Sequence, residues 1–488
     1  MNKFLNLLGF NAEEKKTTIR TEIVAGIVTF LAMAYILVLN PILMLNGTNE
    51  HLFSSVFIAT ALGAVVGTLL MAFLAKLPLA QAPGLGLNSM VGGLLGGGLI
   101  GAALSFGASM LMVLISGVLF LVLSVLKLKG ISVREIIYKA IPESVRGAIS
   151  VGIGLFIAFI GLYNSGNGII VGGLGTPVDL VAFNTWDMAL LAQPLVLLVG
   201  FVVIAILSHF NVKGAVIIGI IAATLFGLIP AINVTTWSNQ SWKFWENFSG
   251  FFSFDVAKGG TFFAAFTDIN FGGASVMSLI MVIITFCMID MFDTMGTCVG
   301  CCSAAGLMTE EGTPKNYNQI MVADSVATCA GALFGTSTVT TFVESGAGVS
   351  AGGKTGITAL TTACMFLLSI FIFPIIASIP GAAANAALIW VGCLMLKGVK
   401  NIKVDSVKDF VPAFLTVAIM PLGYSITDGI GLGMLSYVLI CVCGYLFDLI
   451  SYACSKKEGK EKPVWDVHIV TIIIAVLFLV YFFVPTAF

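Results

Sequence analysis

Two stretches of sequence decide the fold: PLAQAPGLGLNSMVGGLLGGG at residues 78–98 and TSTVTTFVESGAGVSAGGKTG at residues 336–356. In each, a half that is rich in Pro or β-branched residues precedes a Gly-rich half, and this composition disfavours a continuous helix. We expect an extended segment in each stretch, followed by a half-helix that begins near Gly84 or Gly346. The alternative is a pair of Gly-rich packing helices.

Both stretches lie within long apolar segments, so the predicted breaks fall at membrane depth. Irregular backbone is tolerated there only where protein covers it or where it lines a cavity. Corresponding broken segments in the two halves of a chain are typical of the binding sites of secondary transporters. The pair therefore predicts a site near the middle of the membrane.

The composition excludes a soluble protein. Of the 488 residues, 58% are hydrophobic and 10% are charged, against roughly 45–50% and about 25% in soluble domains. The net charge of −1 gives no indication of a nucleic-acid partner. Residues 1–22 are amphipathic and of mixed charge, unlike a cleaved export signal. We predict an all-α, multi-pass protein of the cell membrane, with the lipid bilayer as its surroundings.

Segments of roughly 20 apolar residues predict the membrane spans. The first seven are 23–45, 56–73, 79–100, 106–126, 148–163, 189–210 and 215–230. The second seven are 276–299, 318–335, 336–353, 357–379, 381–396, 410–424 and 430–447. A further apolar segment at 469–484 predicts a terminal helix. With a cytoplasmic N-terminus, all but two of the 23 Lys and Arg residues fall on the cytoplasmic side, as the positive-inside rule requires.

The two sets of seven spans show weak internal similarity in the same order. The matching elements are Thr29-Phe30 with Thr285-Phe286, GLGLNS at 84–89 with GAGVSA at 346–351, and Ile141-Pro142 with Ile379-Pro380. Because seven is odd, the second copy enters the membrane from the opposite side. The sequence thus predicts a seven-plus-seven inverted repeat of fourteen spans, an architecture of many secondary transporters.

Four acidic residues lie within the predicted spans: Asp290, Asp293, Asp324 and Glu344. A carboxylate at the membrane midplane costs at least roughly 2.5–3.5 kcal/mol on insertion scales, so its default interpretation is functional. Asp290 and Asp293 share one helix face, and two such carboxylates in apolar surroundings do not both ionise easily. We therefore expect this pair to carry a coupling proton. Glu344 lies just before a half-helix N-terminus, which stabilises an anion.

Other polar residues in the spans have competing interpretations. For Asp324 we expect a structural or gating role, through interhelical hydrogen bonding or gating, with a direct role in transport as the alternative. Asn88, on the facing half-helix, offers both donor and acceptor groups. Cys298, Cys301 and Cys302 have a spacing that resembles a metal site, but all His residues are far away in sequence. We expect helix packing there, with no metal and no cofactor.

Three segments carry a family resemblance: QAPGLGLN at 81–88, FDTMGT at 292–297 and ADSVATCAGALFGTSTVTTFVESGAGV at 323–349. They resemble the AzgA-like purine permeases, which belong to the nucleobase–cation symporter family together with bacterial uracil and fungal xanthine transporters. The resemblance runs over residues 23–447. Uracil carriers have Glu in span 8 and a His shortly after it, whereas this chain has Asp and no following His. That departure favours a purine over uracil or xanthine.

The resemblance implies a division into two domains. Spans 1–4 and 8–11, at residues 23–127 and 276–380, would form a core domain. Spans 5–7 and 12–14, at residues 128–230 and 381–448, would form a gate domain. Residues 1–22 would be a cytoplasmic segment, 231–275 an extracellular loop, and 449–488 a cytoplasmic linker with the terminal helix. Short strands in spans 3 and 10 would frame the substrate.

The resemblance also implies the function. It implies import of guanine or hypoxanthine, with adenine open, by proton symport with an elevator mechanism. The resemblance does not decide between H⁺ and Na⁺ as the coupling ion, nor whether the protein is a homodimer. The implied substrate-binding residues are Asp293, Glu344, Asn88, Ser345 and Gly86, with Phe342 or Phe292 as a stacking partner. The alternatives are an anion exchanger or channel of the same fold and, more remotely, an intramembrane aspartyl protease, which needs its two Asp on separate helices.

Overall fold

The structure is a computed structural model, and most of its described elements are helices. It describes residues 2–10, 17–45, 47–128, 131–132, 136–137, 140–163, 169–171, 179–180, 188–212, 214–230, 232–234, 251–309, 313–373, 378–402, 405–423, 425–454, 465 and 467–483. Part of the predicted extracellular loop at 231–275, including its three Trp residues, lies outside the described residues, and so does part of the predicted cytoplasmic linker within 449–488.

The first half of the chain supplies the first seven spans. Its helices are α1 (Asn2–Leu7), α3 (Ile19–Met33), α4 (Ile36–Leu45), η1 (Glu50–Leu52), α5 (Phe53–Leu70), η2 (Met71–Ala75), α6 (Leu85–Leu95), α7 (Phe106–Val125), α9 (Glu143–Tyr163), α10 (Met188–His209) and α11 (Ala215–Phe226). Its strands are β1 (Gln81–Pro83), β2 (Lys127–Leu128), β3 (Ile131–Ser132), β4 (Ile170–Val171) and β5 (Asp179–Leu180).

The second half supplies the other seven spans and the terminal helix. Its helices are η3 (Val256–Lys258), α13 (Ala264–Thr267), α14 (Val276–Ala305), α15 (Tyr317–Phe334), α16 (Ser345–Ser350), α17 (Gly356–Ser369), η4 (Ile370–Ile372), α19 (Gly381–Met395), η5 (Leu396–Asn401), α20 (Val407–Leu422), α21 (Ile426–Cys454) and α22 (Ile469–Phe483). Its one described strand is β6 (Val339–Thr341).

Each predicted span coincides with a helix, or with a strand and a half-helix, in the described part of the chain. Over those residues, 8 helical segments are long and apolar enough to cross a membrane by themselves. Span 1 differs from the prediction, because it is two helices, α3 and α4, separated by a turn at Ala34 and Tyr35. Pro41 does not lie at this turn but inside α4, where the helical hydrogen bond that it removes is the one to the carbonyl of Leu37.

The predicted breaks in spans 3 and 10 are confirmed. Strands β1 and β6 pair antiparallel, with Gln81 opposite Thr341 and Pro83 opposite Val339. The half-helices α6 and α16 then begin at Leu85 and Ser345, close to the expected positions. Both strands are completely buried, so the irregular backbone finds its hydrogen-bond partners inside the protein, as a membrane requires.

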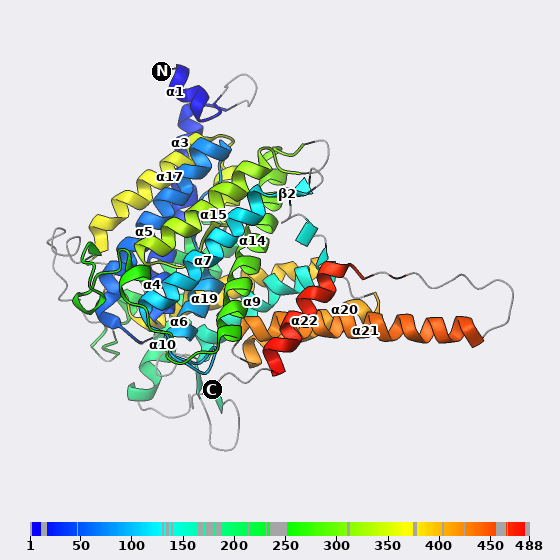
Figure 1. Ribbon diagram of the computed structural model, residues 1–488. Helices are drawn as coiled ribbons and strands as arrows, with labels where there is room; N and C mark the ends of the chain where they lie inside the picture. Colours follow the sequence, from blue (N-terminus) through cyan, green and yellow to red (C-terminus); the bar gives the residue numbers. More distant parts are fainter. Residues whose placement is uncertain are drawn as a thin grey trace.

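Contacts between helices fall into two groups. In one group, α3 packs on α17, and α15 packs on both α5 and α7; in the other, α9 packs on α19 and α20, and α20 packs on α21. Figure 1 shows the first group as the broad bundle and α20 and α21 as an extension to one side of it. This grouping supports the proposed division into core and gate domains, which stays a proposal.

The terminal segment forms helix α22, and this helix packs on the gate-side helix α21 and on α14. The Thr471 hydroxyl donates a hydrogen bond to the carbonyl oxygen of Ala140, which lies just before α9. Figure 1 shows α22 (red) crossing α21 (orange). The extra helix therefore lies against both groups of helices instead of extending the repeat.

Close packing of α16 on α3 depends on Gly348. A Cβ atom at Gly348 would lie 2.0 Å from Oγ1 of Thr29 and 2.7 Å from the backbone oxygen of Ala25. We expect Gly348→Ala to lower the free energy of unfolding by about 1–3 kcal/mol, the usual cost of overpacking. The thermal midpoint of the purified protein, followed by size-exclusion chromatography after heating, measures this change.

Gly296→Ala is the matched control, because a Cβ atom at Gly296 meets nothing within 4 Å. This substitution should leave the thermal midpoint unchanged or raise it slightly, since Ala favours a helix over Gly. Equal midpoints for the two variants would contradict the close contact between α16 and α3.

Candidate substrate site

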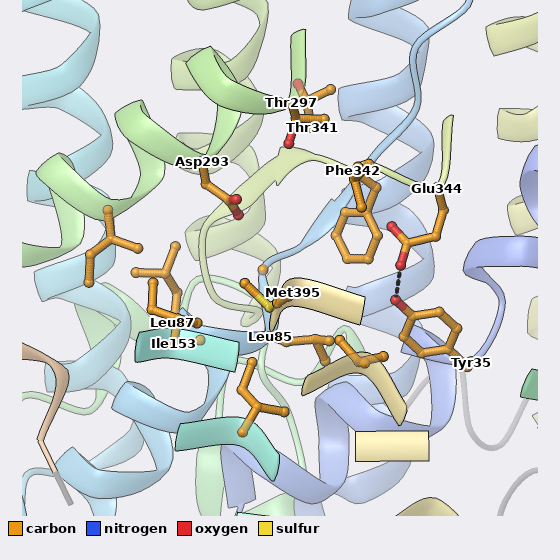
Figure 2. A pocket seen from close by; sticks show the side chains of 16 residues that line it. Tyr35, Leu85, Leu87, Ile153, Asp293, Thr297, Thr341, Phe342, Glu344 and Met395 are labelled. Atoms are coloured by element: carbon orange, nitrogen blue, oxygen red, sulfur yellow. Dashed lines mark hydrogen bonds between the residues drawn. The ribbon is translucent and has the colours of Figure 1, made fainter. Parts of the chain in front are cut away.

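A cavity lies where the two broken spans meet α14. Its empty volume is about 580 Å³, including the space where it opens to solvent. Asp293 of α14, Glu344 at the start of α16 and Phe342 just after β6 contribute to its wall. Figure 2 shows the carboxylates of Asp293 and Glu344 pointing into the space beside the Phe342 ring. The remaining walls are mostly apolar, with Leu85, Leu87, Ile153, Ile157, Ile289, Val391 and Met395 among the lining residues.

The two acidic residues come from different kinds of local structure. Asp293 lies within the long continuous helix α14. Glu344 is the residue before the first residue of α16, and its position is set by the end of strand β6. Both residues line the same cavity. The structure therefore brings together the two acidic residues that the resemblance assigns to the substrate.

Tyr35 is a cavity residue that the sequence analysis did not identify. It lies in the turn between α3 and α4, it is 2% exposed, and its hydroxyl donates a hydrogen bond to Oε1 of Glu344, as drawn in Figure 2. Residues 23–45 were predicted as one continuous span, and that prediction gave no indication of a turn at Tyr35. Pro41 did not mark this position, because it lies inside the continuous helix α4.

Asp290 lies one helical turn before Asp293, but it faces away from the cavity. Its Oδ2 accepts a hydrogen bond of 2.7 Å from the hydroxyl of Thr328 on α15, and it is 1% exposed. The same hydroxyl accepts a hydrogen bond from the backbone N–H of Val339 in β6. Asp290 thus contacts the layer between α14, α15 and the strand, and not the cavity lining.

Asp324 of α15 is tied to strand β1. Its Oδ1 accepts a hydrogen bond of 2.6 Å from Nε2 of Gln81 and one of 3.5 Å from the hydroxyl of Thr341. Gln81 and Thr341 are also opposite each other in the β1–β6 pair. Asp324 therefore connects α15 to both strands, and its structural or gating role stays a prediction.

Of the other predicted substrate residues, one lines the cavity and two form hydrogen bonds beside the strands. Gly86 lines the cavity, and a Cβ atom there would lie 2.8 Å from Cγ2 of Ile153 on α9. Asn88 is completely buried, and its Oδ1 accepts a hydrogen bond from the Ser337 hydroxyl. The Ser345 hydroxyl accepts a hydrogen bond of 3.0 Å from the backbone N–H of Ala80. Neither Asn88 nor Ser345 is among the residues that line the cavity.

Comparison with known proteins places the chain in a family. The sequence pattern of the Permease family (Xan_ur_permease) matches residues 20–432. The chain belongs to this permease family. It is therefore a multi-pass membrane transporter and not an enzyme.

Named permeases resemble the chain over most of its length. The guanine/hypoxanthine permease PbuO of Bacillus subtilis (strain 168) is 36% identical, with 97% of this chain and 100% of that protein covered. The adenine permease AdeQ of Escherichia coli (strain K12) is 34% identical, with 89% of this chain and 90% of that protein covered.

Solved structures of distant transporters share the fold. The transmembrane domain of the cyanobacterium bicarbonate transporter BicA has a TM-score of 0.56 at 14% identity, covering 86% of this permease and 97% of that chain. The murine anion transporter Slc26a9, in its inward-facing state, has a TM-score of 0.55 at 14% identity. The match covers 88% of this permease and 69% of that chain. These likenesses confirm the predicted seven-plus-seven inverted-repeat fold.

The contact between Asp324 and Gln81 leads to a prediction about stability. We expect Asp324→Ala to lower the free energy of unfolding by about 1–3 kcal/mol, because the Gln81 amide N–H is left buried without its acceptor. Asp324→Asn keeps an acceptor oxygen and should lower the thermal midpoint by much less. If Asp324→Ala keeps the wild-type midpoint and loses only transport, Asp324 has a gating role instead.

Proposed function

We propose that this permease imports a purine nucleobase, guanine or hypoxanthine, by proton symport. The observation that carries the proposal is the cavity in which Asp293 and Glu344 project from different elements into apolar surroundings beside the Phe342 ring. Carboxylates accept hydrogen bonds from N–H groups, and an apolar wall favours a planar aromatic ligand. A neutral base with N–H groups along its edges meets both requirements.

The chemistry of the base edges suggests how the two acidic residues are used. Guanine carries N1–H and its exocyclic amine side by side, and two parallel donors match the two oxygens of one carboxylate. Tyr35 already occupies Oε1 of Glu344, so we assign the paired contact to Asp293 and a single contact to Glu344. Hypoxanthine, which has N1–H beside the O6 acceptor, would use one oxygen of Asp293. Phe342 is the assigned stacking partner; Phe292 does not line the cavity.

The named relatives support the same class of substrate. PbuO is named for guanine and hypoxanthine, and AdeQ is named for adenine. Because the two relatives are about equally similar to this chain, adenine stays the alternative purine. An anion exchanger or channel of the same fold is less well supported, because none of the described residues that line the cavity is Lys or Arg.

Substitution of the acidic residues tests the assignment of the site. Asp293→Asn replaces an acceptor by a donor facing the base N–H, so affinity for guanine should fall by roughly ten- to a hundredfold, equivalent to about 1.5–3 kcal/mol. Glu344→Gln should be milder, because a Gln amide still accepts through its oxygen. Equilibrium binding of tritiated guanine and hypoxanthine to the purified variants measures both effects.

Asp290→Asn is the matched control in the same helix. It should spare binding, because Asp290 faces Thr328 and not the cavity. Wild-type affinity in Asp293→Asn, with normal expression, would move the substrate site elsewhere.

Proton coupling is assigned to Asp290 together with Asp293. A buried carboxylate that holds a proton in one conformation and releases it in another is a suitable carrier for import of a neutral base. Uptake of guanine into proteoliposomes should rise with an inward proton gradient and collapse with a protonophore, and Asp290→Asn should lose this dependence. Uptake that follows a Na⁺ gradient and ignores the proton gradient would contradict the assignment.

The proposed movement is of the elevator type. The cavity joins elements of the two helix groups, since Asp293 and Glu344 come from the predicted core, and Ile153, Val391 and Met395 come from α9 and α19 of the predicted gate. A base held by Asp293 and Glu344 would then move past the apolar wall of α9 and α19 when the core domain slides against the gate domain. The Gly86 contact with Ile153 lets α6 lie close to α9 along that surface.

A further inference from the structure

A second, larger cavity lies next to the candidate substrate cavity. Its empty volume is about 1540 Å³, including open solvent, and its lining includes Leu31 of α3, His209 at the end of α10 and Lys397 in η5. By the predicted orientation, the ends of the spans that carry His209 and Lys397 face the cytoplasm. The second cavity is thus a path between the substrate cavity and that side of the membrane.

Three residues line both cavities: Tyr35, Glu344 and Val391. Tyr35 and Glu344 are joined by a hydrogen bond, and Val391 belongs to α19, across from them. The partition between the two cavities is therefore one hydrogen-bonded pair from the predicted core and one apolar side chain from the predicted gate.

Tyr35 and Glu344 each lie in a turn where regular secondary structure is interrupted. Tyr35 is in the turn between α3 and α4, and Glu344 is in the turn between β6 and α16. Helix α3 packs directly on α16, so both residues are carried by one packed unit. Small rotations at either turn separate the hydroxyl from the carboxylate without disrupting a helix.

We propose that Tyr35 is a gating residue, whose hydrogen bond to Glu344 closes the substrate cavity against the second cavity. This inference rests on the proposed function, because the group that passes the partition is the bound base. The base leaves when the Tyr35 hydroxyl separates from Glu344. The bond to a carboxylate is strong enough to change a rate by roughly ten- to a hundredfold.

A gate has a kinetic signature that a direct ligand contact lacks. Tyr35→Phe keeps the ring and removes the hydroxyl, so the association and dissociation rate constants of the base should both rise about tenfold. Kd should change less than about threefold. A direct contact would raise only the dissociation rate and weaken Kd, and a purely structural role would reduce the active fraction without changing either rate.

The measurement is rapid-mixing binding of tritiated guanine and hypoxanthine to the purified full-length protein. Tyr163→Phe is the control, because Tyr163 is 37% exposed and stacks on Phe159 of the same helix α9, away from both cavities. It should leave both rates unchanged. Unchanged rates in Tyr35→Phe, or a weaker Kd with an unchanged association rate, would overturn the proposal.

A second measurement needs no purine. Leu85→Cys places a thiol in the wall of the substrate cavity, and its labelling by a small cationic methanethiosulfonate is followed by mass spectrometry of the α6 peptide. Adding Tyr35→Phe should speed this labelling about tenfold, while adding Tyr163→Phe should not. If the wild type binds no base, the proposed function fails and labelling alone decides on the gate; equal labelling rates overturn the gate.

Discussion

The antiparallel pairing of β1 with β6 is the interaction on which the rest of the structure depends. Extended backbone at membrane depth has no water to bond, so each strand needs the other to satisfy its N–H and C=O groups. The pairing joins residues more than 250 positions apart and fixes the two half-helices on either side of one point. Two more backbone hydrogen bonds extend this pairing beyond the strands. The Phe342 N–H donates to the carbonyl of Ala80, and the Gly84 N–H donates to the carbonyl of Thr338.

The hydrogen bonds around the strands explain why four membrane carboxylates have different roles. Asp290 is held by Thr328, whose hydroxyl also contacts β6, and Asp324 is held by Gln81, a residue of β1. These two acidic residues support the paired backbone from α14 and α15. Asp293 and Glu344 lie beyond the strand layer and project into the cavity. All four side chains end in a carboxylate, and the contacts with Thr328 and Gln81 distinguish Asp290 and Asp324 from the two carboxylates that face the cavity.

The fold and part of the site could be predicted because they depend on local composition. Pro83, the Gly-rich halves and the β-branched run at 338–341 indicated both breaks, and apolar length and charge bias located the other spans. Asn88 and Ser345 were assigned to the substrate because they lie on the correct segments. A sequence does not show which way a side chain on such a segment turns, and both turn toward Ser337 and Ala80. Tyr35 was missed for a related reason, since an apolar run with one Pro does not show where its helix is interrupted.

The two repeats share the strands but not the chemistry of the site. Counted from the paired positions Ala82 and Thr340, Gly86 and Glu344 each lie four residues further on, and both line the cavity. One repeat thus supplies a glycine that lets α6 approach α9, and the other supplies a carboxylate. Span 1 is broken and carries the Tyr35 hydroxyl, whereas its counterpart α14 is continuous and carries Asp293. The inverted repeat determines where the cavity lies. The differences between the two repeats give it two carboxylate acceptors, Asp293 and Glu344, from the second repeat and one hydroxyl donor, Tyr35, from the first.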